Sequence, residues 1–181
     1  MVAAFLDRAT RAFLARHRVA RFASADAAGG PHIVPLCYAL AGEHLYFVVD
    51  AKPKQPGGLA LRRMRNLAEN AAVALVVDDY AEDWTALAFL MIRGRADIVT
   101  DGRERKRALT ALRTRYPQYR AMALDGPEHP VVRITPNHAH LWQAAKAPRI
   151  IPRDDGAQPA RRAGSRDRPT SPRPRVPQAR R

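Results

Sequence analysis

The spacing of apolar residues predicts a helix at the start of the chain and a run of short strands after it. Residues 2–16 place Phe5, Phe13 and Leu14 on one helical face, with arginines on the remaining surface. The next stretches read RVARFASA, PHIVPLCYAL and LYFVVDA, separated by the turns DAAGG and AGEH. Apolar runs between short glycine-containing turns are typical of antiparallel strands. We therefore expect an amphipathic helix followed by a three-stranded antiparallel meander.

The second half of the chain mixes helical and strand-like patterns less regularly. Helical spacing recurs over residues 59–70 and 103–116, the second segment ending before Pro117. The strand-like runs are AVALVVDDY, then ALAFLMIRGRADIVT with a bend expected at Gly94, and VVRITP with HAHLWQA as a last strand or hairpin. Because helices and strands do not alternate one by one, about six strands with three helices predict an α+β fold on a small closed barrel.

Charge divides the chain into two parts. The 181 residues carry a net charge of +14, and residues 148–181 hold 10 Arg against 3 Asp, so this tail contributes +7. The tail is rich in Pro and Arg and nearly devoid of apolar residues after Ile151, so it cannot bury enough surface to offset the entropy of ordering. We predict a folded domain over residues 1–147 and a disordered tail over residues 148–181.

Charge and hydropathy also bear on partners and location. An arginine-rich tail attracts nucleic acid and anionic surfaces through charge, although a merely solvated extension has the same composition. No apolar run is long enough to span a bilayer, and Asp7, Arg8 and Arg11 interrupt the N-terminal stretch where a signal peptide needs an apolar core. We expect a cytoplasmic protein that binds no membrane and binds nucleic acid only weakly, through the tail.

Thiol and metal chemistry find little support in the sequence. Cys37 is the single cysteine and lies among apolar neighbours, so we interpret it as a buried and unreactive thiol. His138 and His140 share one strand face, a spacing that two metal ligands can use, but no third ligand with suitable spacing is evident. We predict no metal site.

Positive charge gathers where a strand leads into a helix, in the stretch VVDAKPKQPGGLALRRMRN. At about 100° per residue, Met64 and Leu67 share the helical face that packs on the barrel. This periodicity directs Arg62 and Arg65 outward and leaves Arg63 at the flank of the buried stripe. We therefore expect Arg63 to be the best placed of these cations to hold an anion.

Four motifs carry a resemblance to a known family: D-A-K-P-K, R-R-M-R-N, D-D-Y-A-E-D-W and R-Y-P-Q-Y-R. With the stretch VARFASADAAGGPHIVPLCYAL, they make residues 3–143 similar to the pyridoxamine 5′-phosphate oxidase-like superfamily of split β-barrel flavoproteins. More narrowly, the chain resembles the branch of deazaflavin-dependent enzymes that use coenzyme F420. The resemblance implies a six-stranded split antiparallel β-barrel of the FMN-binding type, with flanking helices. It also implies a homodimer with two cofactor sites at the subunit interface.

The resemblance suggests what the basic junction is for, because members of the superfamily hold the cofactor phosphate at this point. Lys52, Lys54 and Arg63 are the candidate phosphate ligands, and Asn66 is the neighbouring family position. Ammonium and guanidinium groups beside a helix N-terminus suit a phosphate on chemical grounds as well.

By the same resemblance, the flavin-type ring meets a strand interrupted by two prolines. Backbone groups of His32, Ile33, Val34 and Pro35 are the expected ring contacts, and prolines there indicate an edge or a bulge. A histidine beside a turn is also typical of an ordinary surface residue. Trp84 is expected either to anchor the dimer or to cover the cofactor, with simple packing as the alternative.

The combined prediction is an F420-dependent oxidoreductase that transfers a hydride between the deazaflavin and an unknown small organic substrate. The alternative cofactor is FMN, since both molecules present a tricyclic ring and a phosphate. The alternatives of another class are a noncatalytic cofactor carrier and a basic nucleic-acid-associated module. No side chain is assigned a catalytic role.

Overall fold

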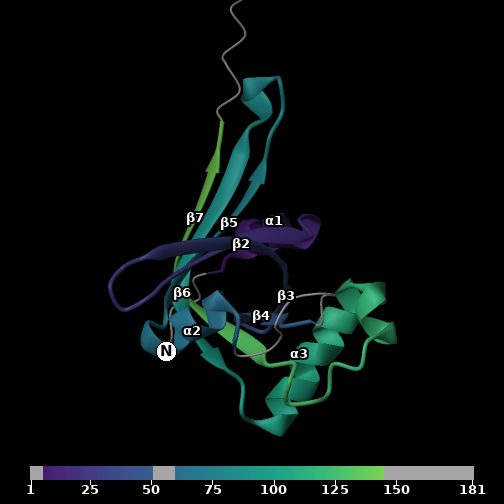
Figure 1. Cartoon of the computed structure of the whole chain (residues 1–181). Helices are drawn as coiled ribbons and strands as arrows, with labels where there is room; N and C mark the ends of the chain where they lie inside the picture. Colours follow the sequence, from purple (N-terminus) through teal and green to yellow (C-terminus); the bar gives the residue numbers. More distant parts are fainter. Residues whose placement is uncertain (1–5, 51–59, 145–181) are drawn as a thin grey trace, which may run out of the picture. The chain divides into compact units, whose positions relative to one another are not determined.

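The computed structural model describes residues 6–50 and 60–144 (Figure 1). The predicted tail, with the disorder expected of it, lies outside the described residues. Twelve elements follow one another in the described part: α1 (Arg8–Arg16), β1 (Val19–Ala25), β2 (Pro31–Cys37), β3 (Ala39–Ala41), β4 (His44–Val48), α2 (Arg62–Glu69), β5 (Ala72–Asp79), η2 (Trp84–Ala86), β6 (Ala88–Ile98), α3 (Gly102–Arg115), η3 (Pro117–Ala121) and β7 (Val131–Gln143).

The strands form one curled antiparallel sheet in the order β2-β1-β5-β6-β7-β4-β3. The two edge strands, β2 and β3, are separated in sequence by Tyr38 alone, so the sheet must curl until its edges meet there. This confirms the predicted α+β split barrel, with seven strands instead of six. The added strand arises because PHIVPLCYAL, expected to be one strand, divides at Tyr38 and pairs with β1 before it and with β4 after it.

A continuous strand replaces the hairpin considered for the C-terminal part of the domain. β7 runs for 13 residues and pairs with both β4 and β6. At Gly94, where a bend is expected, the register of β6 against β7 shifts, and the extra residue lies in β7. A Cβ atom at Gly94 would lie 2.3 Å from the Thr135 carbonyl oxygen, so the close approach of β7 requires glycine.

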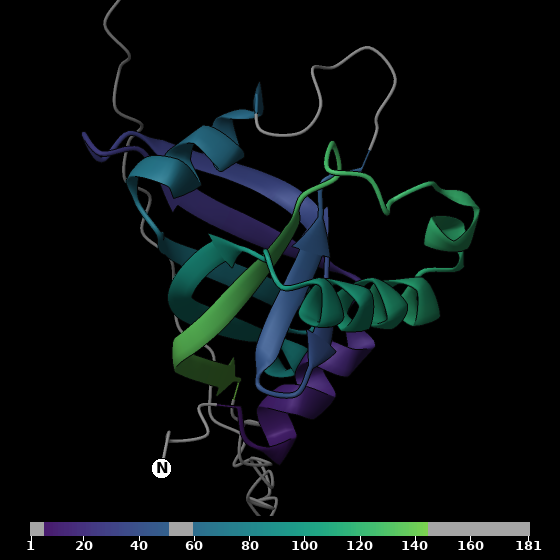
Figure 2. The ribbon, with the colours of Figure 1, turned by 90° about the horizontal axis from the view of Figure 1, so that it is seen from below.

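Side chains of β4 alternate between two apolar cores. Leu45 and Phe47 face the barrel interior, whereas Tyr46 and Val48 face the layer under α3. Figure 2 shows α3 lying along β4 on the outside of the barrel. Asp101 begins α3 by accepting hydrogen bonds from the N–H groups of Arg103 and Glu104.

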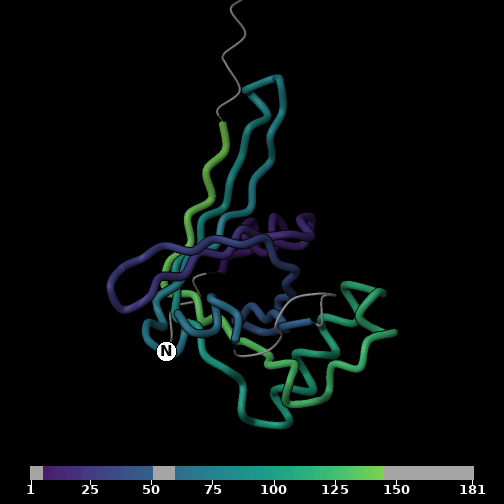
Figure 3. Tube along the Cα trace, viewed as in Figure 1, coloured from purple at the N-terminus to yellow at the C-terminus, as the bar shows by residue number. Residues whose placement is uncertain are grey.

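Strands β5, β6 and β7 extend past α1 as a three-stranded arm (Figures 1 and 3). The short helix η2 closes the tip of the arm, where the Asp83 carboxylate accepts from the N–H and hydroxyl of Thr85. Trp84 lies at this tip with 72% of its surface exposed. Among the helices that the structure describes, none has the length and apolar content needed to cross a membrane.

Candidate functional site

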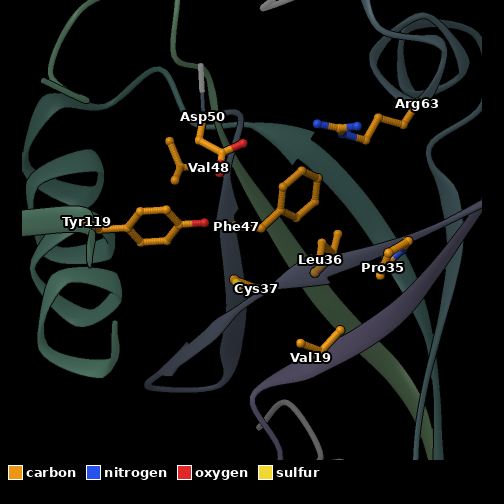
Figure 4. Close-up of a pocket in the computed structure, with 9 residues that line it drawn as sticks. All are labelled: Val19, Pro35, Leu36, Cys37, Phe47, Val48, Asp50, Arg63 and Tyr119. Carbon is orange, nitrogen blue, oxygen red and sulfur yellow. The ribbon is translucent and has the colours of Figure 1, made fainter. Parts of the chain in front are cut away.

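A cavity of about 220 Å³ opens between the barrel, α2 and η3 (Figure 4). Its apolar lining comes from strands β1, β2 and β4. Four further side chains supply polar or reactive groups: Cys37, Asp50, Arg63 and Tyr119. The elements that contribute them are far apart in sequence, so only the curled sheet brings these groups to one place.

Helix α2 presents Arg63 to this cavity. Met64 and Leu67 are buried against the barrel, Arg62 and Arg65 are exposed, and Arg63 is half-buried between them. The arrangement of these side chains is the one that the helical period predicts. It follows from local geometry, because α2 must bury one apolar stripe.

The Arg63 guanidinium is short of partners within the described part of the chain. Its Nε atom is buried and has no hydrogen-bond partner there, and no carboxylate lies within ion-pair distance. Burial lowers the pKa of Arg63, while the nearby Asp50 carboxylate and Tyr119 act against this shift. A desolvated cation that faces a cavity favours the binding of an anion.

Asp50 and Tyr119 also line the cavity, and Figure 4 shows Asp50 between Tyr119 and Arg63, with Cys37 below them in this view. Burial raises the pKa of the Tyr119 phenol, which therefore stays protonated at neutral pH. Cys37 is only half-buried and lines the cavity, which corrects the expectation of a fully buried thiol. Its apolar neighbours Val34, Leu36 and Tyr38 pack on the core inside the barrel, whereas Cys37 packs on the second core, so they do not enclose it.

The four predicted ring contacts in β2 lie on both faces of the strand. Pro35 lines the cavity, Val34 packs on the barrel core, and Ile33 is 64% exposed. His32 is half-buried, and its pKa is lowered by burial first and by Arg62 and Arg63 next. The neutral imidazole is therefore the form that this position favours near pH 7.

The remaining predicted site residues lie elsewhere. Asn66 is buried, and its Nδ2 atom donates to Ser24 Oγ at 3.1 Å, which joins α2 to β1. Trp84 occupies the tip of the arm and does not line this cavity. Lys52 and Lys54 lie outside the described residues.

Sequence reasoning gave no role to two polar residues of the cavity, Asp50 and Tyr119. Both belong to motifs that carry the family resemblance, D-A-K-P-K and R-Y-P-Q-Y-R, so the motifs marked them without indicating a role. Nothing in the local pattern shows that a residue after α3 faces a residue after β4.

The curled sheet with its flanking helices defines a protein of the split β-barrel class. The family profile described as pyridoxamine 5′-phosphate oxidase matches residues 6–143, and the chain belongs to this family. No curated protein sequence matches the chain significantly. In the described residues, no group of three His, Cys, Asp or Glu side chains is placed to hold a metal ion.

Solved structures of several different proteins share the fold. The conserved hypothetical protein Rv2991 from Mycobacterium tuberculosis is 19% identical, with a TM-score of 0.61 over 76% of this chain and 85% of that one. The heme storage protein HutZ from Vibrio cholerae is 17% identical, with a TM-score of 0.57 over 76% and 94% of the two chains. An FAD-binding protein from Mesorhizobium loti is 25% identical, with a TM-score of 0.53 over 71% and 88%.

Proposed function

We propose that this chain is an oxidoreductase that binds a phosphorylated flavin-type cofactor, coenzyme F420 or FMN, at the cavity beside α2. The observation that carries the proposal is the half-buried Arg63 guanidinium, whose Nε atom has no partner among the described residues. A planar guanidinium of this kind pairs well with a phosphate, and family membership makes a flavin-type phosphate the expected ligand.

The bound ring would supply the hydride chemistry, and the protein would position it and exclude water. Arg63 would hold the phosphate, and apolar side chains such as Leu36 and Phe47 would shield the rest of the ligand from solvent. The described residues fit both cofactors, since each has a ring and a phosphate. The FAD-binding protein of the same fold supports a flavin, whereas the basic junction favours the additional negative charge of F420.

Titration of FMN and of F420 into the purified protein, followed by ring fluorescence, tests the proposal. Arg63→Ala should weaken binding about 10- to 150-fold, since a hydrogen bond to a charged partner contributes roughly 1.5–3 kcal/mol. The matched control Arg62→Ala removes an exposed guanidinium and should change affinity less than about threefold. Failure of the unmodified protein to bind either cofactor would overturn the proposal. Equal losses of cofactor affinity in the two variants would show that Arg63 does not bind the phosphate.

We further propose that two copies of the chain form a homodimer that completes the site. The cavity of about 220 Å³ is smaller than the roughly 300–1,000 Å³ of most ligand sites. The outward face of the arm carries Met91 together with Phe89 and Trp142, whose rings stack with centroids 5.5 Å apart. An apolar sheet face of this kind suits the core of an interface, and Trp84 at the arm tip could then approach the partner's cofactor.

Light scattering tests the dimer. A mass of two 20.1 kDa chains is expected, and Phe89→Glu should reduce it to that of one chain. Ile98→Glu, which changes another exposed apolar residue at the far end of β6, should leave the dimer intact. A single-chain mass for the unmodified protein at micromolar concentration would contradict the proposal.

A further inference from the structure

Helix α3 carries six cations and a single acid, and the acid is turned inward. The Glu104 carboxylate accepts from the Tyr46 hydroxyl at 2.7 Å and forms an ion pair with Arg133 at 3.1 Å. Only 14% of the Glu104 side chain is exposed. The one acid of this helix is thus engaged within the domain, and it does not balance the positive charge on the solvent side.

Three of the six cations are also engaged within the domain. Arg105 and Arg115 each donate to backbone carbonyls outside α3, the shortest of the distances given being 2.8 Å for both. Arg113 pairs with Asp125 at 2.9 Å. These contacts hold the segments that surround α3, so they leave three cations to account for.

The other three cations, Arg103, Lys106 and Arg107, lie on the exposed face of α3. None of them forms an ion pair within the part of the chain that the structure describes. The Arg107 side chain makes one hydrogen bond there, to the Tyr46 hydroxyl at 3.5 Å. Three neighbouring positive charges without carboxylate partners favour the binding of an anion that carries several charges.

These cations border a hollow of about 510 Å³ beside α3. The rest of its lining consists of Thr110 and two alanines, Ala41 and Ala111. Small side chains leave room for the backbone of a polyanion to approach the charges. Because α3 lies on the outside of the barrel, the hollow is open to solvent (Figure 2).

The spacing of the cations along α3 matches the charge density of a nucleic-acid duplex. Arg103 and Arg107 are four residues apart, which is about 6 Å along the helix axis, and Lys106 lies between them. Duplex DNA carries about one charge per 1.7 Å of its axis, so it presents roughly three to four phosphates over the same length. Three cations can therefore each meet a phosphate.

The remaining side chains of this face separate duplex DNA from other anionic partners. Membrane-binding helices and protein interfaces need apolar anchors, and single-stranded nucleic acid stacks on aromatic side chains. Among the described residues, none of the exposed large apolar or aromatic side chains lies on α3. The hydroxyls of Thr110 and Thr114 donate to carbonyls inside α3, both at 2.9 Å, so they offer no donor to the 2′-hydroxyls of RNA.

We propose that the exposed face of α3 binds the phosphate backbone of duplex DNA through Arg103, Lys106 and Arg107. The binding is independent of base sequence, because contacts of arginine and lysine with phosphates carry no sequence information. This activity is separate from the cavity beside α2, and it does not rest on the proposed function.

Fluorescence anisotropy of a labelled DNA duplex, titrated with the full chain, tests the proposal. The variant that combines Arg103→Ala, Lys106→Ala and Arg107→Ala should bind at least about 10-fold more weakly at about 50 mM salt. The slope of log affinity against log salt concentration should become shallower by about 2–3, since each phosphate contact contributes about 0.9. The arginine-rich tail is the same in every variant, so any attraction that it adds is constant.

A matched control removes the same charge elsewhere. Arg62, Arg65 and Arg95 are exposed on α2 and β6, and their combined replacement by Ala also lowers the net charge by three. This variant should bind the duplex with less than about a threefold loss, because charges beyond a Debye length are screened. Thermal unfolding of both triple variants should match that of the unmodified protein, since the replaced side chains are exposed.

Four outcomes would overturn the proposal. Failure of the unmodified protein to bind the duplex would exclude the activity, and equal losses in the two triple variants would reduce it to net charge. An unchanged affinity in the α3 variant would assign DNA binding to another part of the chain. Binding of phosphatidylserine vesicles through the α3 cations, without binding of the duplex, would assign this face to a membrane surface.

Discussion

Two regions of this molecule use the same residue types in opposite ways. The cavity contains Arg63 and Tyr119. Arg115 and Tyr116 lie at a second place, the junction where α1 and the end of α3 meet the chain between β2 and β3. At this junction the Tyr116 hydroxyl accepts from the Tyr38 N–H at 3.1 Å and from Arg115 Nε at 3.1 Å. It can also donate to the Tyr38 carbonyl at 2.8 Å or to that of Arg18 at 2.6 Å.

Arg115 is equally well satisfied. Its Nη2 atom donates to the Leu14 carbonyl at 2.8 Å and to the His17 carbonyl, and its guanidinium lies 5.1 Å from the centroid of the Tyr38 ring. These contacts tie the end of α1 to the point where the barrel closes. Arg63 and Tyr119, in contrast, have their hydrogen-bonding capacity directed into a cavity. These two regions therefore differ more in hydrogen-bond satisfaction than in residue type.

A large difference in stability is expected between two tyrosine variants. Tyr116→Phe leaves the buried Tyr38 N–H without an acceptor. The loss of this one hydrogen bond should lower the free energy of unfolding by about 1–3 kcal/mol. Tyr119→Phe should change it by less than about 0.5 kcal/mol, since no backbone group depends on that hydroxyl. Urea denaturation of the two variants measures both values. Similar losses would erase the distinction between scaffold and site.

The arginine pair should show a difference of the same sign and comparable size. Arg115→Met should destabilise the fold by roughly 1.5–3 kcal/mol, the range of a hydrogen bond from a charged donor. Arg63→Met should leave the stability of the cofactor-free protein unchanged or raise it by up to about 1 kcal/mol, because it removes a desolvated charge. Thermal unfolding without ligand provides the measurement. A clear loss of stability in Arg63→Met would show that this guanidinium has a structural partner.

The smallest expected effect is on the pKa of His32, which lies near the arginines of α2. Burial and the two arginines lower its pKa, so folding favours the neutral ring. Its contribution to stability is therefore complete above the usual histidine pKa and is lost as the pH falls through the lowered value. NMR titration should show a His32 pKa below that of an exposed histidine, rising in Arg63→Ala. A His32 pKa at or above the usual value would place these charges farther from the ring than α2 brings them.

Much of the fold could be predicted because its signals are local. The period of α2 predicts that Met64 and Leu67 are buried and that Arg63 lies beside them, and the structure confirms this arrangement. The number of strands was less predictable, since PHIVPLCYAL has no internal turn signal at Tyr38. The strand divides there because the sheet must close, which is a global constraint.

By itself, the sequence determined the α+β class, the family and the position of Arg63 on its helix, because periodicity and motifs depend on neighbouring residues. Only the tertiary structure decided that Arg63 shares a cavity with Asp50 and Tyr119, and that Asn66 instead binds Ser24. These pairings join residues far apart in the chain. They depend on how far the sheet curls and where α3 and η3 pack, so no local pattern could specify which polar groups would meet and which would remain without partners.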